Sequence, residues 1–330
     1  INKSLNLHLS VPAFFQNPTI SKLAAVLDEE GHQLQPGLMQ LSPGRRGAGA
    51  LFILDASIGL CRLAQHLECS GMAIFTTTIP LSRESLLAAA QGKTSATPTL
   101  QELAAAHTAL ILRQQTLGPC VLMGYSFGGL LAFEVARQLR RQGRQVEAVL
   151  LIDSWLRYPP WYKKLKILTF GRAKNSLKFH ASHLWSITKA KISRLLTPGR
   201  ASRNPPFVIP EGSSLLPGDV PWEIVEMIYR SAKSNYRLLS LDTRAILFRS
   251  QHNFVAHLYP IHPHLGWKGL FLSGLQIVEV PGDHYSLLKD PQVMVLAGRI
   301  SESLKALATS SHKTPQGSAK ETHPICTPVN

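Results

Sequence analysis

A serine lies between two glycines, Gly124-x-Ser126-x-Gly128, within the stretch VLMGYSFGGLLAFEVARQLRRQ of residues 121–142. A serine hydroxyl is a weak nucleophile, which needs a base to take its proton and N–H groups to hold the oxyanion. The apolar run before Ser126 is typical of a strand and the amphipathic run after it of a helix, and a sharp turn between them would expose the serine at a helix N-terminus. The pattern predicts Ser126 as a nucleophile. The alternative is that Ser126 only caps a glycine-rich helix.

An acid should follow this nucleophile, because the chain order in α/β-hydrolases is serine, acid, histidine. The segment VLLIDSW places Asp153 directly after the next apolar strand, so it should lie beside Ser126 at the same sheet edge. No Asp or Glu occurs from Thr243 to Ile277, so the loop after the following strand offers no acid. Asp153 is therefore the predicted acid, with a solvated loop aspartate as the alternative. Asp283 is the rival, since it adjoins the candidate histidine.

The predicted base is His284, in the segment VEVPGDHYSLLKDP. It follows the last apolar strand in a Pro-Gly-Asp turn, where this fold carries its histidine. The chain has thirteen histidines, so a histidine alone would say little. Four others lie upstream without this strand and turn: His252, His257, His262 and His264.

The oxyanion needs two backbone N–H donors. One should belong to Phe127, the residue after the nucleophile. The second should come from the loop that follows the strand at 51–54, which reads DASIG, and Ser57 is the preferred residue there.

Short apolar strands alternate with helical patterns, which predicts an α/β fold with a mostly parallel sheet and helices on both faces. About ninety residues separate two of the strands and contain helical patterns at about 161–195 and 221–239, so we expect a helical lid over about 155–240. The predicted strands are 51–54, 72–75, 120–125, 146–152, 245–248 and 275–280, and the predicted helices are about 60–67, 101–116, 127–142 and 291–307.

The ends of the chain have a different composition. Residues 32–50 are rich in Gly, Pro and polar residues and are predicted to be a linker, and residues 309–330 a disordered tail. Residues 1–31 end in a short helical pattern that Thr19 or Ser21 could cap. Because the chain opens on Ile rather than Met, we expect it to be a piece of a longer polypeptide or the product of an incomplete gene model.

The net charge of +15 is uneven, because residues 154–210 carry twelve Lys or Arg and no acid. Such a segment could be a solvated face or could attract an acidic partner. We expect no nucleic acid, since no binding module is recognisable. Four scattered cysteines without metal-ligand spacing indicate reduced thiols and a cytoplasmic location, and no apolar run reaches transmembrane length.

The segments GYSFGGLLAFEVARQL, VLLIDSW, SNYRLLSLDTRAILFRS, LGW and VPGDHYSLL, in this order, resemble the C-terminal thioesterase domain of nonribosomal peptide and polyketide synthases. The resemblance covers about residues 38–308 and implies the α/β-hydrolase fold. It also implies a triad of Ser126, Asp153 and His284, since that family carries its aspartate after the strand that follows the nucleophile helix. Free-standing editing thioesterases usually carry it one strand later. The implied reaction moves an acyl or peptidyl chain to Ser126 and releases it by hydrolysis or cyclisation.

The segment LSVPAFFQNPTISKLAAVL resembles the last third of a phosphopantetheine carrier domain, which gives the expected domain limits: 1–31 carrier fragment, 32–50 linker and 51–308 thioesterase. The attachment serine would lie upstream, because neither Ser4 nor Ser10 sits in a matching motif. The resemblance thus implies no cofactor bound by this chain. Its substrate would arrive on the 4′-phosphopantetheine of an upstream carrier domain, and the synthase modules would be its partners.

One loop departs from that family. Its strand-end loop commonly reads His-Pro-x-Gly-Gly, whereas this chain has Asp55-Ala56-Ser57-Ile58-Gly59. An acid there could weaken the oxyanion pocket if its side chain points inward. This acid motivates one alternative, a catalytically inactive hydrolase fold that serves as a binding domain. A second alternative is a free-standing esterase or lipase of the same fold, against which the carrier fragment argues.

Overall fold

The computed structural model describes residues 37–55, 57–69, 71–79, 81–114, 118, 120–156, 220–252 and 262–311, together with Thr19 and Ser21. The rest of the expected carrier fragment lies outside the described residues, as does the helical pattern at 161–195 with nearly all of the basic segment. None of the described helices combines the length and the apolar character that crossing a bilayer requires.

The described strands form one seven-stranded sheet in the order β1-β3-β2-β4-β5-β6-β7. β1 runs antiparallel to β3, and every other neighbouring pair is parallel. The carboxyl ends of the parallel strands therefore meet at one edge of the sheet, and the segments that follow them lie close together. The strands are β1 (Gly37–Ser42), β2 (Ala50–Leu54), β3 (Ala73–Thr78), β4 (Cys120–Tyr125), β5 (Val146–Ile152), β6 (Arg244–Ser250) and β7 (Leu275–Val280).

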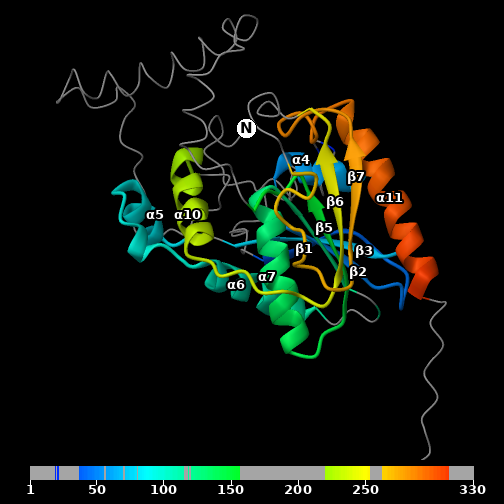
Figure 1. The fold of residues 1–330 in the computed structure, drawn as a ribbon, viewed down its shortest axis with the longest axis horizontal. Coiled ribbons are helices and arrows are strands. Elements are labelled where there is room, and N and C mark those ends of the chain that lie inside the picture. Colours follow the sequence, from blue (N-terminus) through cyan, green and yellow to red (C-terminus); the bar gives the residue numbers. More distant parts are fainter. Residues whose placement is uncertain are drawn as a thin grey trace, which may run out of the picture.

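Helices cover both faces of this sheet, and Figure 1 shows α7 and α11 on opposite sides of it. The helices are α4 (Ile58–Gln65), α5 (Arg83–Ala90), α6 (Leu100–Arg113), α7 (Phe127–Arg141), α10 (Trp222–Ser234) and α11 (Gln292–Ser311), with a 3₁₀ turn at Thr94–Ala96. Side chains cap several of them. The Ser57 and Ser82 hydroxyls accept N–H groups of α4 and α5, and Thr99 forms a capping box with Glu102 on α6.

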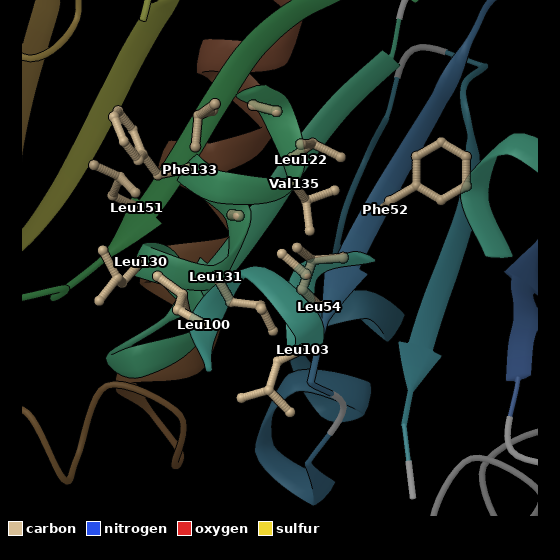
Figure 2. Packing of buried hydrophobic residues seen from close by; sticks show 14 of the residues in the cluster. Phe52, Leu54, Leu100, Leu103, Leu122, Leu130, Leu131, Phe133, Val135 and Leu151 are labelled. Carbon is tan, nitrogen blue, oxygen red and sulfur yellow. The ribbon is translucent and has the colours of Figure 1, made fainter. Parts of the chain in front are cut away.

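Successive residues of the central strands pack on opposite faces, which is why these strands read as continuous apolar runs. Phe52 and Leu122 pack with α6, α7 and α10, and Figure 2 shows this side of the core. Leu51 and Val121 pack with α4 and α11 on the other side. The sheet is thus the middle of three layers, and its central strands are buried on both faces.

Most predicted elements are present, with three differences. β1 lies inside the expected linker, 32–50, where its half-buried residues show no apolar run. An antiparallel edge strand takes its backbone hydrogen bonds from β3, and no local sequence pattern reveals that partner. α5 was not predicted, and α11 continues three residues into the expected tail, 309–330.

Candidate active site

The turn at Ser126 is tightly constrained. Ser126 has φ 54° and ψ −116°, a conformation that few residues other than glycine adopt. Its N–H donates to the carbonyl of Ile152 on the neighbouring strand at 2.9 Å. A Cβ on Gly124 would lie 2.0 Å from the carbonyl oxygen of Gly128, so the chain can fold back here only without that side chain. The serine stands between the end of β4 and the start of α7, as the sequence pattern predicts.

Gly124→Ala should therefore destabilise the protein by about 2 kcal/mol or more, because the added methyl meets a backbone atom that cannot swing aside. Gly298→Ala is the matched control, since it lies in α11 with open space around its Cβ position and should add about 0.5–1 kcal/mol of stability. Thermal denaturation measures both. Equal melting temperatures for Gly124→Ala and the unmodified protein would contradict the constraint.

Asp153 lies at the end of β5 and is held from two sides. Its Oδ1 accepts the N–H of Ser250 at 3.0 Å and the Ser250 hydroxyl at 2.9 Å. Its Oδ2 lies 2.7 Å from Nδ1 of His284 and 3.4 Å from Nε1 of Trp155. The carboxyl is fully buried, and every described contact to its oxygens comes from a group able to donate a hydrogen bond.

These donors decide the charge of Asp153. Burial alone would raise the pKa of this carboxyl, but the hydrogen bonds that it accepts from His284 and Ser250 favour the ionised form, and the pKa is lowered. Asp153 is therefore ionised near neutral pH, and Nδ1 of His284 is the protonated ring nitrogen that donates to it. The other ring nitrogen, Nε2, is left to accept a proton, which is the orientation a general base needs.

His284 lies in the loop after β7 and contacts the residue that precedes the serine. The Tyr125 ring stacks on the His284 ring with centroids 4.8 Å apart, and the Tyr125 hydroxyl donates to the His284 carbonyl. Within the described parts of the chain, the Ser126 hydroxyl makes no hydrogen bond. Bonds between nucleophile and base are often long until substrate binds.

The rival residues have other roles. Asp283 Oδ1 accepts the N–H groups of Tyr285 and Ser286 at 2.8 and 3.0 Å, so this carboxyl stabilises the turn that carries His284. In the part of the chain that the structure describes, Asp153 is hydrogen-bonded to no histidine other than His284. His252, His262 and His264 are described residues, and His257 lies outside them.

Phe127 directly follows the nucleophile, and the strand that precedes Ser57 ends beside the turn. Phe127 is the first residue of α7, so its N–H has no acceptor within the helix. A Cβ on Gly128 would lie 3.4 Å from the carbonyl of Leu54, which brings the end of β2 next to the turn. The N–H of Asp55 already donates to Thr77 at 3.1 Å. A donor from this loop must therefore come from a later residue, and Ser57, the N-cap of α4, is such a residue.

Asp55, the residue that departs from the family loop, is engaged by a helix far along the chain. Its Oδ2 accepts the hydroxyl of Tyr229 on α10 at 2.6 Å. Burial raises the pKa of Asp55, and the hydrogen bond from Tyr229 opposes that rise. Burial and the Asp55 charge raise the pKa of Tyr229, so the tyrosine stays protonated and is the donor.

Four contacts at the site were not predicted: those of Ser250, Trp155, Tyr125 and Tyr229. Ser250 could have been found, because it ends β6 beside β5 at the same sheet edge. The others depend on side-chain directions that no local pattern carries. The described residues include no group of His, Cys, Asp and Glu arranged to hold a metal ion.

A parallel sheet between helices, with a serine at a strained turn from strand to helix and a hydrogen-bonded Asp–His pair beside it, defines the α/β-hydrolase class. Residues 63–167 match the thioesterase domain family. That match covers 105 of the 330 residues.

Curated relatives are synthetases. The vanchrobactin synthetase VabF of Vibrio anguillarum is 32% identical over 166 residues, which are 48% of this chain and 6% of that protein. The indigoidine synthase of Dickeya dadantii (strain 3937) is 26% identical over 308 residues, which are 89% of this chain and 19% of that protein. The chain thus spans less than a fifth of the length of either relative.

Solved structures share the fold. A four-domain nonribosomal peptide synthetase bound to AMP and glycine has a TM-score of 0.54 and 19% identity, over 92% of this chain and 23% of that one. The NocB thioesterase domain, in covalent complex with a fluorophosphonate nocardicin G analogue, has a TM-score of 0.51 and 20% identity. That match covers 81% of this chain and 99% of that one.

Proposed function

We propose that this chain releases an acyl or peptidyl chain from a carrier-bound phosphopantetheine thioester, as a serine thioesterase of nonribosomal peptide or polyketide synthesis. The observation that carries the proposal is the 2.7 Å contact between His284 Nδ1 and Asp153 Oδ2, next to a serine in a strained turn. A structural role alone does not require an ionised, fully buried aspartate to orient a histidine at this edge of the sheet.

The first half of the proposed reaction forms an acyl-enzyme. His284 Nε2 takes the Ser126 proton while Ser126 Oγ attacks the thioester carbonyl, and Asp153 stabilises the resulting imidazolium. The N–H groups of Phe127 and Ser57 would hold the oxyanion. Collapse of the tetrahedral intermediate breaks the C–S bond, and the departing thiol takes the proton from His284.

The second half frees the product. Water, or a hydroxyl or amine of the acyl chain itself, attacks the acyl-serine while His284 takes its proton. The C–O bond to Ser126 then breaks, and the proton returns to the serine oxygen. Hydrolysis gives an acid, and internal attack gives a ring.

The proposed partner is an upstream carrier domain, for which residues 1–31 would supply the end. We also propose a cytoplasmic location, because the four scattered cysteines are typical of reduced thiols. Three of them lie in the described residues and are free and buried: Cys61, Cys69 and Cys120.

A comparison of leaving groups tests the proposal. An acyl-pantetheine thioester should be cleaved with a higher kcat/KM than the oxygen ester of the same acyl chain, with one free thiol released per acyl group. A fluorophosphonate probe should label Ser126, because it reacts with an activated serine. Preference for the oxygen ester would favour a free-standing esterase, and absence of both labelling and turnover would favour the inactive binding domain.

A further inference from the structure

Tyr229 makes two contacts with the parts of the site that should hold the oxyanion. Its ring lies flat against the ring of Phe127, with centroids 4.0 Å apart and an interplanar angle of 8°. Its hydroxyl donates to the Asp55 carboxyl at 2.6 Å. One side chain therefore joins the residue after the nucleophile to the loop after β2.

The Asp55 contact bears on a strained backbone. Asp55 has φ 59°, in the left-handed region, which is unfavourable for most residues and persists where surrounding contacts hold it. The Tyr229 hydroxyl is the described side-chain partner of its carboxyl. Ser57, the candidate second donor, lies two residues further along, so a shift of Asp55 would move it.

The position of Tyr229 depends on α10. The buried side chains of Val225, Ile228 and Ala232 pack α10 into the core, and α10 lies beside α5 (Figure 1). Trp222, the first residue of α10, makes a T-shaped ring contact with Tyr229, with centroids 6.4 Å apart. α10 falls in the range expected as the lid, so docking of this helix and assembly of the oxyanion pocket are joined through one residue.

We propose that Tyr229 is a positioning residue, which holds Phe127 through its ring and the Asp55 loop through its hydroxyl, so that both oxyanion donors are aligned only while α10 is docked. The inference rests on the proposed function. The hydrogen bond from Tyr229 also gives Asp55 a structural role, because it anchors the loop after β2 to α10.

Tyr229→Phe should keep the ring contact and lose the anchor. Because this variant loses the hydrogen bond that holds the Asp55 loop, we expect the oxyanion donors to be misaligned. The kcat for a pantetheine thioester should then fall about tenfold to a hundredfold, with KM nearly unchanged. Asp55→Asn should retain most of the activity, because the amide oxygen can still accept the hydroxyl and Asn tolerates positive φ. Asp55→Gly permits the backbone angle but has no acceptor, and should match Tyr229→Phe. The double variant Asp55→Gly/Tyr229→Phe should have a kcat no lower than that of either single variant, because both substitutions remove the same hydrogen bond.

Tyr236→Phe is the matched control. Tyr236 follows α10 and donates to Glu134, a buried carboxylate on α7, so this variant also removes a hydroxyl bonded to a carboxylate. It should lower the melting temperature and leave kcat unchanged. Equal losses of kcat in Tyr229→Phe and Tyr236→Phe, or a Tyr229→Phe enzyme with unmodified kcat, would overturn the positioning role. Labelling of the unmodified protein with a fluorophosphonate probe distinguishes failure of the proposed function from failure of the positioning role. If Ser126 of the unmodified protein stays unlabelled, the proposed thioesterase function is wrong, independently of the results for the Tyr229 variants.

Discussion

Ser126→Ala is expected to lower turnover of an acyl-pantetheine thioester by about 10⁶-fold, the scale seen when a triad nucleophile is removed. The reason is that no acyl-enzyme can form without the hydroxyl. Mass spectrometry of the unmodified protein with a slowly released acyl chain should find the added acyl mass on the peptide that contains Ser126. The same experiment on Ser126→Ala should find none.

Ser154→Ala provides the control for that variant. Ser154 is buried just after β5, the strand next to the one that carries the nucleophile, and its hydroxyl has no hydrogen-bond partner within the described residues. Removing it should leave turnover unchanged and stability equal or slightly higher, since an unpaired buried hydroxyl is unfavourable. Acyl mass on another residue, or turnover that survives in Ser126→Ala, would contradict the assignment of the nucleophile.

Asp153→Asn is expected to reduce kcat by about 10⁴-fold, with little change in the fold. The amide group keeps the shape of the side chain but carries no charge, so the imidazolium loses its partner and the histidine can adopt the wrong tautomer. Steady-state kinetics give kcat, and the melting temperature checks the fold.

Asp283→Asn tests the rival acid directly. Asp283 accepts two backbone N–H groups in its turn, and an Asn oxygen can accept them as well. This variant should keep most of the activity. If instead Asp283→Asn inactivates the protein and Asp153→Asn does not, the acid has been wrongly assigned.

The sequence predicted the positions of the buried strands and of the residues that follow them. Apolar runs predicted β4 and β5 with their observed limits, because strands buried on both faces leave a clear pattern. The limits of β7 were predicted as well, although only its last residue, Val280, is buried. Because parallel strands end at one sheet edge, Asp153 was expected beside Ser126, and the turn after the last strand indicated His284 as the partner of Asp153. β1 could not be predicted in the same way, because an edge strand with half-buried residues leaves no such pattern.

The support around Asp153 and Asp55 was much harder to predict. Ser250 lies 97 residues from Asp153 in the chain, and Tyr229 lies 174 residues from Asp55. Contacts at such separations depend on how α10 and β6 pack against the sheet. The sequence showed that Asp55 was unusual in its loop, but the residue that satisfies its carboxyl belongs to a helix whose position no local pattern specifies.

β5 and β6 are paired neighbours although roughly ninety residues separate them in the chain. The entropy lost on closing a loop grows only with the logarithm of its length, so doubling the intervening segment would cost about 0.6 kcal/mol. Asp153 precedes this segment and is fixed by Ser250, which comes after it. The segment could therefore be lengthened, shortened or exchanged at small thermodynamic cost, provided that α10 is kept, while the Asp153–His284 pair keeps its geometry. Chimeras that exchange only residues 157–219 should therefore still fold, which thermal denaturation measures.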